Sequence, residues 1–200
     1  LESAPASIRD YRVVRPLARG FYSAAFVAEA GKLNRKYVLK VSPKAIYDFF
    51  KKDFERECKE HERIADTSEH VVKIIDFFDA EILFGDLKLS CHVAVLDYID
   101  GVPLAEFISA DRSVAEIAQM AIDLFRILGE FRRAGKSHND LHGGNIIMQN
   151  VARPMDSLDT RHKAVVIDLG SVADGSKSSL EECRLGDLHW IVRHLEEMAE

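Results

Sequence analysis

The residues best suited to chemistry lie in one polar segment, Ser137 to Met148. Within it, Asp140 stands five residues before Asn145, with two glycines between them. A turn rich in small residues can direct both side chains to one point. The carboxylate of Asp140 can hold an acceptor hydroxyl or take its proton, and the amide oxygen of Asn145 can bind a hard cation such as Mg²⁺. By itself, the segment also fits a capped turn between a helix and a strand.

His138 completes the pattern H-x-D-L-x-x-x-N, which resembles the catalytic loop of the protein-kinase-like superfamily, H-R-D-L-x-x-x-N. The resemblance implies an enzyme that uses ATP and Mg²⁺ to phosphorylate a hydroxyl group. Asp140 would then orient the acceptor hydroxyl, and Asn145 would bind Mg²⁺. The resemblance also requires a nucleotide-covering turn, a strand lysine and its acidic partner before the loop, and a second metal-binding acid after it.

Upstream of the loop, residues 19–23 are expected to form a turn between two strands, 11–18 and 24–30. This hairpin resembles the nucleotide-covering hairpin of kinases, whose backbone amides approach the phosphates and favour small residues. The family pattern is G-x-G-x-x-G, and Gly20 and Ser23 stand at two of its three glycine places. Only one glycine is therefore present, and an ordinary hairpin stays open as the alternative.

Lys40 ends an apolar run that predicts a strand, and it resembles the strand lysine that contacts the α- and β-phosphates in kinases. A helix is expected over residues 46–66, because the residues of its core-facing side recur every three or four positions: Ile46, Phe50, Phe54, Cys58, His61 and Ala65. Glu57 borders that apolar face, and the resemblance assigns it as the partner of Lys40. Lys36 is the alternative to Lys40, and Glu60 is the alternative to Glu57. It also stays open that these residues are only solvated charges at the surface.

Two further strands are expected over residues 71–78 and 87–98. The second runs into Asp97–Gly101, which is similar to the hinge between the two lobes of a kinase. Backbone groups near Asp97 and Ile99 would bind the edge of adenine, so both belong to the expected nucleotide-binding set.

A short helix is expected over residues 104–108, and a long helix is expected to lead into the loop. Ser113 and Glu116 form an S-x-x-E capping box at its start, and Gly135 ends it. The expected core-facing stripe consists of Val114, Ile117, Ala118, Ala121, Leu124, Phe125, Leu128 and Phe131.

After the loop, a strand expected at residues 164–167 ends in Asp168-Leu169-Gly170. This resembles the D-F-G metal site, in which Asp168 would link Mg²⁺ to the nucleotide phosphates. A polar insertion precedes the strand, at residues 149–162. Asp187 is expected to open a helix and, by resemblance, to brace the backbone of the catalytic loop; Trp190 follows in the same motif. The side chains of this helix expected to face inward are Leu188, Ile191, Val192 and Leu195.

Composition narrows the class of protein. The 200 residues are 47% hydrophobic, and the net charge is −6, which argues against a nucleic-acid-binding domain. Three cysteines without a C-x-x-C pair suggest reduced thiols in a cytoplasmic protein. The sequence has no run of 18 apolar residues, so no membrane span is expected. It begins without Met, and we expect an excised piece with further domains of a longer chain.

Together these features predict an α+β, two-lobed protein-kinase-like fold. Residues 1–97 would form a β-rich N-lobe with one main helix, and residues 98–200 a helical C-lobe that is minimal or truncated. The expected reaction transfers the γ-phosphoryl group of ATP to a hydroxyl, with Lys40 and Glu57 positioning the phosphates.

The acceptor is less narrowly defined. A Ser/Thr protein kinase is the first expectation, because Asp187-Leu188-x-Trp190 is similar to the motif of protein kinases. In Ser/Thr kinases a lysine usually follows the catalytic aspartate by two residues, whereas this sequence has His142. The run from His142 to Asn145 is similar to small-molecule phosphotransferases such as aminoglycoside kinases, which is the first alternative. A nucleotide-binding pseudokinase scaffold is the second.

We expect the enzyme to be active without phosphorylation of the segment from Asp168 to Asp187. This segment has no Thr or Tyr, and Asn139 replaces the Arg of H-R-D that would grip a phosphate. Its serines are Ser171, Ser176, Ser178 and Ser179. Replacing all of them with alanine, or dephosphorylating the parent protein, should leave initial rates within about tenfold, roughly 1.4 kcal/mol of transition-state stabilisation. A larger loss would show that Lys177 or Arg184 holds a required phosphoserine.

Overall fold

The computed structural model describes residues 4–20, 23–151, 162–174 and 180–198. The tip of the first hairpin, most of the expected insertion, and three of the four serines named above lie outside these ranges. The chain is mixed α+β, as expected, and divides into two compact units. Unit 1 comprises residues 1–63 and 73–98, and unit 2 comprises residues 64–72 and 99–200. The sequence placed a boundary after residue 97 and assigned 64–72 to the first part.

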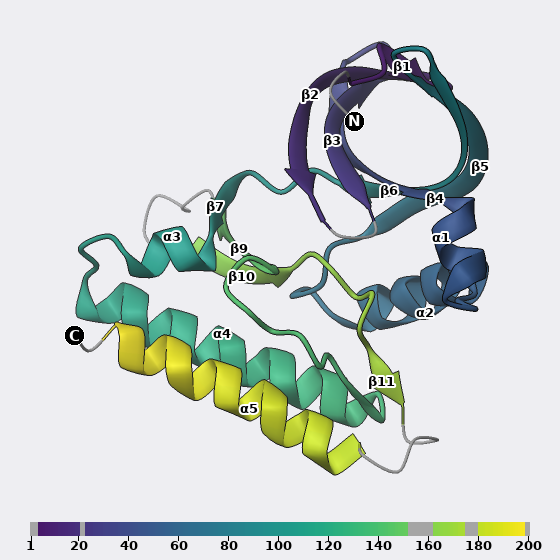
Figure 1. The fold of residues 1–200 in the computed structure, drawn as a ribbon. Coiled ribbons are helices and arrows are strands. Elements are labelled where there is room, and N and C mark those ends of the chain that lie inside the picture. Colours follow the sequence, from purple (N-terminus) through teal and green to yellow (C-terminus); the bar gives the residue numbers. More distant parts are fainter. Residues whose placement is uncertain (1–3, 21–22, 152–161, 175–179, 199–200) are drawn as a thin grey trace. The chain divides into compact units, whose positions relative to one another are not determined.

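Unit 1 contains one six-stranded antiparallel sheet, in the order β1-β2-β3-β4-β6-β5. It curls until it is nearly closed (Figure 1). Its strands are β1 (Ser7–Ile8), β2 (Tyr11–Arg19), β3 (Ala24–Ala30), β4 (Arg35–Pro43), β5 (Ile74–Phe84) and β6 (Leu87–Asp97). The expected strands match these closely, except that β5 begins three residues later than expected and continues to Phe84.

Alternating side chains give the sheet an apolar inside. Leu39 and Val41 of β4 are 0% and 2% exposed, and Val93 and Val95 of β6 are fully buried against them. Because successive side chains of a strand point to opposite faces, Lys40 lies on the outer face of the sheet.

Side chains, rather than a ladder, link the two edge strands. Arg9, in the turn after β1, donates a hydrogen bond to the carbonyl of Asp79 in β5 at 2.9 Å. Its guanidinium also lies over the ring of Phe78, 3.7 Å from the centroid. These contacts help to keep the curled sheet from opening.

The single helix expected over residues 46–66 was wrong. The structure has two helices there, α1 (Lys44–Phe49) and α2 (Phe54–Thr67). Lys51 adopts a left-handed conformation, with φ of 51°, which an α-helix does not accommodate. Asp53 then starts α2, because its carboxylate accepts a hydrogen bond from the N–H of Arg56 at 3.0 Å. Phe50, expected to face the core, is 44% exposed.

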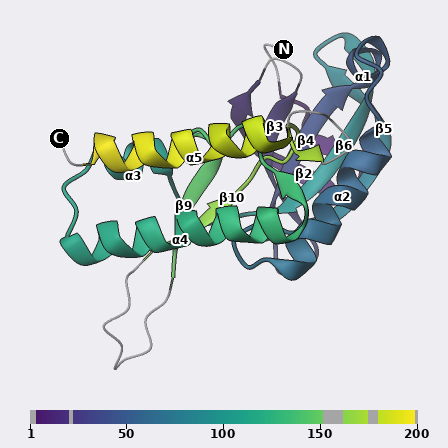
Figure 2. The ribbon, with the colours of Figure 1, turned by 90° about the horizontal axis from the view of Figure 1, so that it is seen from below.

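Unit 2 combines helices with two small sheets. Its helices are α3 (Leu104–Ile108), α4 (Val114–Arg133) and α5 (Leu180–Glu197). Its strands are β7 (Gly101–Pro103), β8 (Lys136–Ser137), β9 (Ile146–Asn150), β10 (His162–Val166) and β11 (Ala173–Asp174), in sheets ordered β10-β9-β7 and β11-β8. The axes of α4 and α5 are nearly parallel (Figures 1 and 2), and the two helices contact each other. None of the helices in the described ranges has the length and apolar character needed to cross a membrane.

The capping box of α4 is confirmed, since Ser113 and Glu116 exchange both hydrogen bonds. The expected core-facing stripe was partly wrong: Val114 is 83% exposed and Phe125 is 50% exposed. The buried face instead carries Met120, Asp123, Leu124, Ile127 and Phe131. Asp123 faces inward because its carboxylate accepts hydrogen bonds from the side chain of Gln119 at 2.8 Å and from the N–H of Ala164 at 3.1 Å.

Helix α5 also differs from the expectation. It begins at Leu180, seven residues before Asp187, where the sequence placed its start. Two residues expected to face inward, Leu188 and Val192, are 39% and 42% exposed. The buried positions are Asp187, Ile191 and His194, which lie on one face of the helix.

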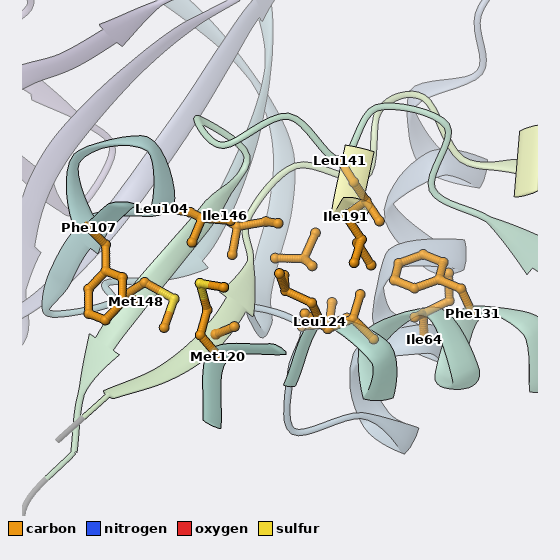
Figure 3. Close-up of a cluster of buried hydrophobic side chains, with 14 of the residues drawn as sticks. Ile64, Leu104, Phe107, Met120, Leu124, Phe131, Leu141, Ile146, Met148 and Ile191 are labelled. Carbon is orange, nitrogen blue, oxygen red and sulfur yellow. The ribbon is translucent and has the colours of Figure 1, made fainter. Parts of the chain in front are cut away.

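The core of unit 2 reaches into the polar segment that opened the sequence analysis. Leu141 is fully buried and lies next to Ile191 of α5 (Figure 3). The same cluster contains Leu104, Phe107, Met120, Leu124, Phe131, Ile146 and Met148. Leu141 therefore anchors the polar loop in the core, with Asp140 and His142 on either side of it.

Two glycines of unit 2 should respond in opposite directions to substitution by alanine. A Cβ at Gly101 would overlap the carbonyl of Met148 and lie 2.9 Å from the Cα of Gln149, whereas one at Gly186 would meet nothing within 4 Å. Gly101→Ala should lower the free energy of unfolding by about 1–3 kcal/mol. Gly186→Ala, inside α5, should raise it by about 0.5–1 kcal/mol. Urea denaturation would measure both, and equal effects would contradict the close pairing of β7 with β9.

Candidate active site

The candidate site begins where α4 ends. Gly135 has a φ of 70°, which suits the residue that terminates a helix. The chain then passes through β8 into the loop 138–145 and continues into β9. Within the loop, Asn139 has a φ of 64°, a conformation that asparagine tolerates better than most residues. The carbonyls and amides near Asn139 therefore point in directions that a helix or strand would not allow.

Asp187 holds the first half of this loop. Its carboxylate accepts hydrogen bonds from the N–H of His138 at 2.8 Å and from the N–H of Asn139 at 2.7 Å. It also accepts one from the hydroxyl of Ser137. Asp187 is only 2% exposed, so these bonds replace the water that the carboxylate and the two amides would otherwise bind. The expectation that Asp187 braces the loop backbone is confirmed.

His138 links two parts of the site. It is fully buried. Its Nδ1 accepts a hydrogen bond from the N–H of Asp140 at 3.3 Å, and its Nε2–H donates to the carbonyl of Asp168. One acceptor and one donor nitrogen describe a neutral imidazole. Burial lowers the pKa of His138, although the charge of Asp187 opposes that effect, so the ring favours this neutral form.

Asp140 and Asn145 meet as their spacing predicted. The Nδ2 of Asn145 donates to the carbonyl of Asp140 at 3.0 Å and to its carboxylate at 3.1 Å. The amide therefore turns its nitrogen towards Asp140, and its oxygen points the other way. The backbone of Asn145 is also held, because its N–H donates to the carbonyl of His142 at 2.9 Å and its carbonyl accepts from Ile167 at 3.0 Å.

Asp168 follows the end of β10, two residues after Val166. Its carboxylate accepts a hydrogen bond from the N–H of Gly170 at 2.9 Å, which fixes the turn after the strand. The bond between Ile167 and Asn145 joins the chain just before Asp168 to the end of the loop. Asp140, Asn145 and Asp168 are thus held by one connected set of hydrogen bonds that passes through His138.

These residues fit the demands of Mg²⁺. Asn145 and Asp168 offer oxygen ligands, and Mg²⁺ is commonly bound by one or two carboxylates together with phosphates and water. Among the described residues, no three His, Cys, Asp or Glu side chains gather into a group that could hold a metal. Asn145 and Asp168 stay the predicted protein ligands of Mg²⁺, which the phosphates of a nucleotide would share.

In unit 1, Lys40 occupies a row of small residues. It pairs with Ala25 of β3 and with Ala94 of β6, so an alanine lies on each side of it on the outer face of the sheet. Lys40 is partly buried in this row, and its expected contact with phosphate stays a prediction.

Glu57 lies in the first turns of α2. Its carboxylate accepts a hydrogen bond from the hydroxyl of Tyr47 at 2.9 Å and lies 3.8 Å from the Nζ of Lys52. Burial raises the pKa of the neighbouring Cys58 to about 12; the charge of Glu57 adds to the rise, and the charge of Lys40 opposes it. Both charges therefore act on one thiol, and the expected pairing of Lys40 with Glu57 stays a prediction.

The remaining nucleotide-binding candidates are placed as follows. The N–H of Gly20 donates to the carbonyl of Ser23 at 2.8 Å, which closes the first hairpin. The N–H of Asp97 donates to Lys73 at 2.9 Å, so an adenine contact from Asp97 would have to use its carbonyl. Ile99 is partly buried, and it is the first residue of unit 2 after the boundary at Tyr98.

Sequence reasoning missed a second hydrogen bond by which α5 fixes the loop. His194 of α5 is 3% exposed, and its Nε2–H donates to the carbonyl of Leu141 at 3.0 Å. His194 follows Asp187 by two helical turns, so both side chains project from one face of α5. That spacing was visible in the sequence, but only a correct placement of the helix would have given it meaning.

Comparison with known proteins gives no independent support for the roles of these residues. The sequence matches no protein-family model and no curated protein. The roles given to these residues therefore depend on the contacts described above and on the pattern of the loop.

Removing the carboxylate of Asp187 should destabilise the loop and unit 2 together. Asp187→Ala leaves the buried N–H of His138, the part-buried N–H of Asn139 and the buried hydroxyl of Ser137 without their acceptor, so the free energy of unfolding should fall by about 3 kcal/mol or more. Glu196→Ala, which alters an exposed acid on the same helix, should change it by less than about 0.5 kcal/mol. Chemical denaturation measures both. Similar small losses in the two variants would show that Asp187 does not brace the loop.

Proposed function

We propose that the protein is an ATP-dependent phosphotransferase that transfers the γ-phosphoryl group to a hydroxyl. The observation that carries the proposal is the connected arrangement of Asp140, Asn145 and Asp168 around a buried neutral His138. Asp187 supports that arrangement from α5. A two-lobed kinase-like fold belongs to the same proposal, with unit 1 as the β-rich part and unit 2 as the helical part.

Each residue has a defined task in this reaction. Asp140 would accept a hydrogen bond from the acceptor hydroxyl and receive its proton as the new bond to phosphorus forms. Asn145 and Asp168 would hold Mg²⁺, and Lys40 would contact the phosphates, with Glu57 as its partner. When bound, Mg²⁺ would neutralise charge on the phosphate oxygens.

The fixed loop explains how so few side chains would suffice. Phosphoryl transfer needs mainly positioning and charge neutralisation, because the protein forms no covalent bond to the group that is transferred. The hydrogen bond from Asn145 already orients the carboxylate of Asp140. The loop would therefore not have to reorganise when the acceptor arrives.

A Ser or Thr hydroxyl of a protein is the first acceptor we propose, because Asp187 and Trp190 keep the spacing of the protein-kinase motif. One observation favours a small molecule instead. Helix α5 begins at Leu180, so little chain separates it from Asp168 for binding an extended peptide. Labelled ATP would separate these acceptors by showing whether label enters protein or a small molecule.

Two aspartates of the site should have separable effects. Asp140→Ala should lower phosphoryl transfer from labelled ATP by at least about 100-fold, while the thermal shift produced by ATP with Mg²⁺ stays nearly unchanged. Asp168→Ala should reduce both transfer and the thermal shift, because it removes a ligand of the Mg²⁺ that accompanies ATP. Asp111→Ala, at an exposed acid before α4, is the control and should change neither.

Near-native turnover in Asp140→Ala would contradict the assignment of the loop. If the parent protein binds ATP with Mg²⁺ but transfers no phosphoryl group, the pseudokinase alternative would hold instead.

A further inference from the structure

The ring of His142 lies beside the carboxylate of Asp140 and points a donor towards the same space. Its Nδ1 accepts a hydrogen bond from the N–H of Gly144 at 3.1 Å. In a neutral ring the other nitrogen then carries the proton, so Nε2 is the donor. Nε2 lies 3.9 Å from Oδ2 of Asp140. That separation is too long for a hydrogen bond, so the carboxylate does not use the donor.

The donor is also accessible. The side chains of His142 and Asp140 are each 43% exposed. Within the described part of the chain, Nε2 of His142 donates a hydrogen bond to no side chain or carbonyl. A substrate oxygen that approaches Asp140 would therefore meet an N–H group that is ready to donate.

The surroundings of the ring fix its direction. The ring of Trp190 contacts it at 6.2 Å between centroids, with an interplanar angle of 63°. Trp190 stacks in turn on His194, whose Nε2–H holds the carbonyl of Leu141. On the other side, a Cβ at Gly144 would lie 3.0 Å from the ring of His142. A larger residue at position 144 would therefore push the ring out of this position by a few tenths of an ångström.

We propose that His142 is a further catalytic residue, whose Nε2–H donates a hydrogen bond to an oxygen of the phosphoryl group during transfer. This role rests on the proposed function. The acceptor oxygen forms a bond to phosphorus, the bond from phosphorus to the departing ADP oxygen breaks, and the proton of the acceptor passes to Asp140. His142 keeps its own proton throughout and stabilises the charge on the phosphoryl oxygen. Trp190 and Gly144 are positioning residues for its ring.

A transition-state mimic separates this role from simple packing. Calorimetric titrations would measure the affinity for ADP with Mg²⁺, first without and then with aluminium fluoride. Aluminium fluoride imitates the phosphoryl group in the transition state of its transfer. The parent protein should bind ADP more tightly when aluminium fluoride is present. His142→Ala should lose roughly tenfold or more of that enhancement and keep its affinity for ADP. Turnover of labelled ATP should fall by a similar factor.

Three further variants complete the design. His142→Gln keeps an N–H donor at a similar reach, and it should recover most of the enhancement. Gly144→Ala keeps His142 but pushes its ring, and it should lose part of the enhancement with unchanged affinity for ADP. His189→Ala removes an exposed histidine of α5 that neighbours Trp190 in sequence, and it should behave like the parent protein.

The outcomes are distinguishable. An equal enhancement in the parent and in His142→Ala would overturn the role of His142 and leave the proposed function standing. The same holds if the parent binds ADP but gains nothing from aluminium fluoride. If the parent binds no nucleotide, the proposed function and this role fall together. If His142→Ala does not fold, the comparison of His142→Gln with Gly144→Ala decides, and equal full enhancement in both would overturn the proposal.

Discussion

The carboxylate of Asp187 is the contact on which the candidate site depends. A loop that leaves a helix and carries a left-handed residue exposes backbone amides that no regular structure can satisfy. Asp187 accepts hydrogen bonds from two of these amides, at His138 and Asn139, while it is itself almost fully buried. A buried carboxylate without such donors would be costly, and buried amides without an acceptor would be costly as well. Each therefore requires the other, and the hydrogen bonds to Asp187 restrict the conformation of the loop.

Everything else in the site follows from that fixed loop. His138 can serve as a neutral link because burial lowers its pKa and its two ring nitrogens have one donor and one acceptor as partners. Leu141 enters the apolar core, which leaves Asp140 and His142 directed outward on either side of it. His194 donates a hydrogen bond to the carbonyl of Leu141. Helix α5 therefore binds the loop both at His138 and Asn139, through Asp187, and at Leu141. A rigid polar turn supported by an apolar anchor suits chemistry that works by positioning.

In unit 1, the curl of the sheet decides which side chains face its interior and which face outward. Its sheet curls around an apolar interior, and alternation along β4 sends Lys40 to the outer face between two alanines. A lysine in that place gains no stability from the interior of the sheet. Lys40 belongs to the proposed function as the residue expected to contact the phosphates, and this contact is a prediction.

The sequence by itself determined the features that arise from neighbouring residues. The capping box of Ser113 and Glu116, the hairpins, the short helix α3 and the approach of Asn145 to Asp140 all depend on contacts within a few positions, so local patterns predicted them. Tertiary structure decided which face of α4 is buried, because apolar residues lie on more than one side of that helix and only the N–H of Ala164, 41 residues away, selects the side that carries Asp123. It also split the helix expected over residues 46–66 and gave Glu57 the partners Tyr47 and Lys52. His194 gained its role in the same way, since periodicity specifies which residues share a face but the fold alone decides what that face meets.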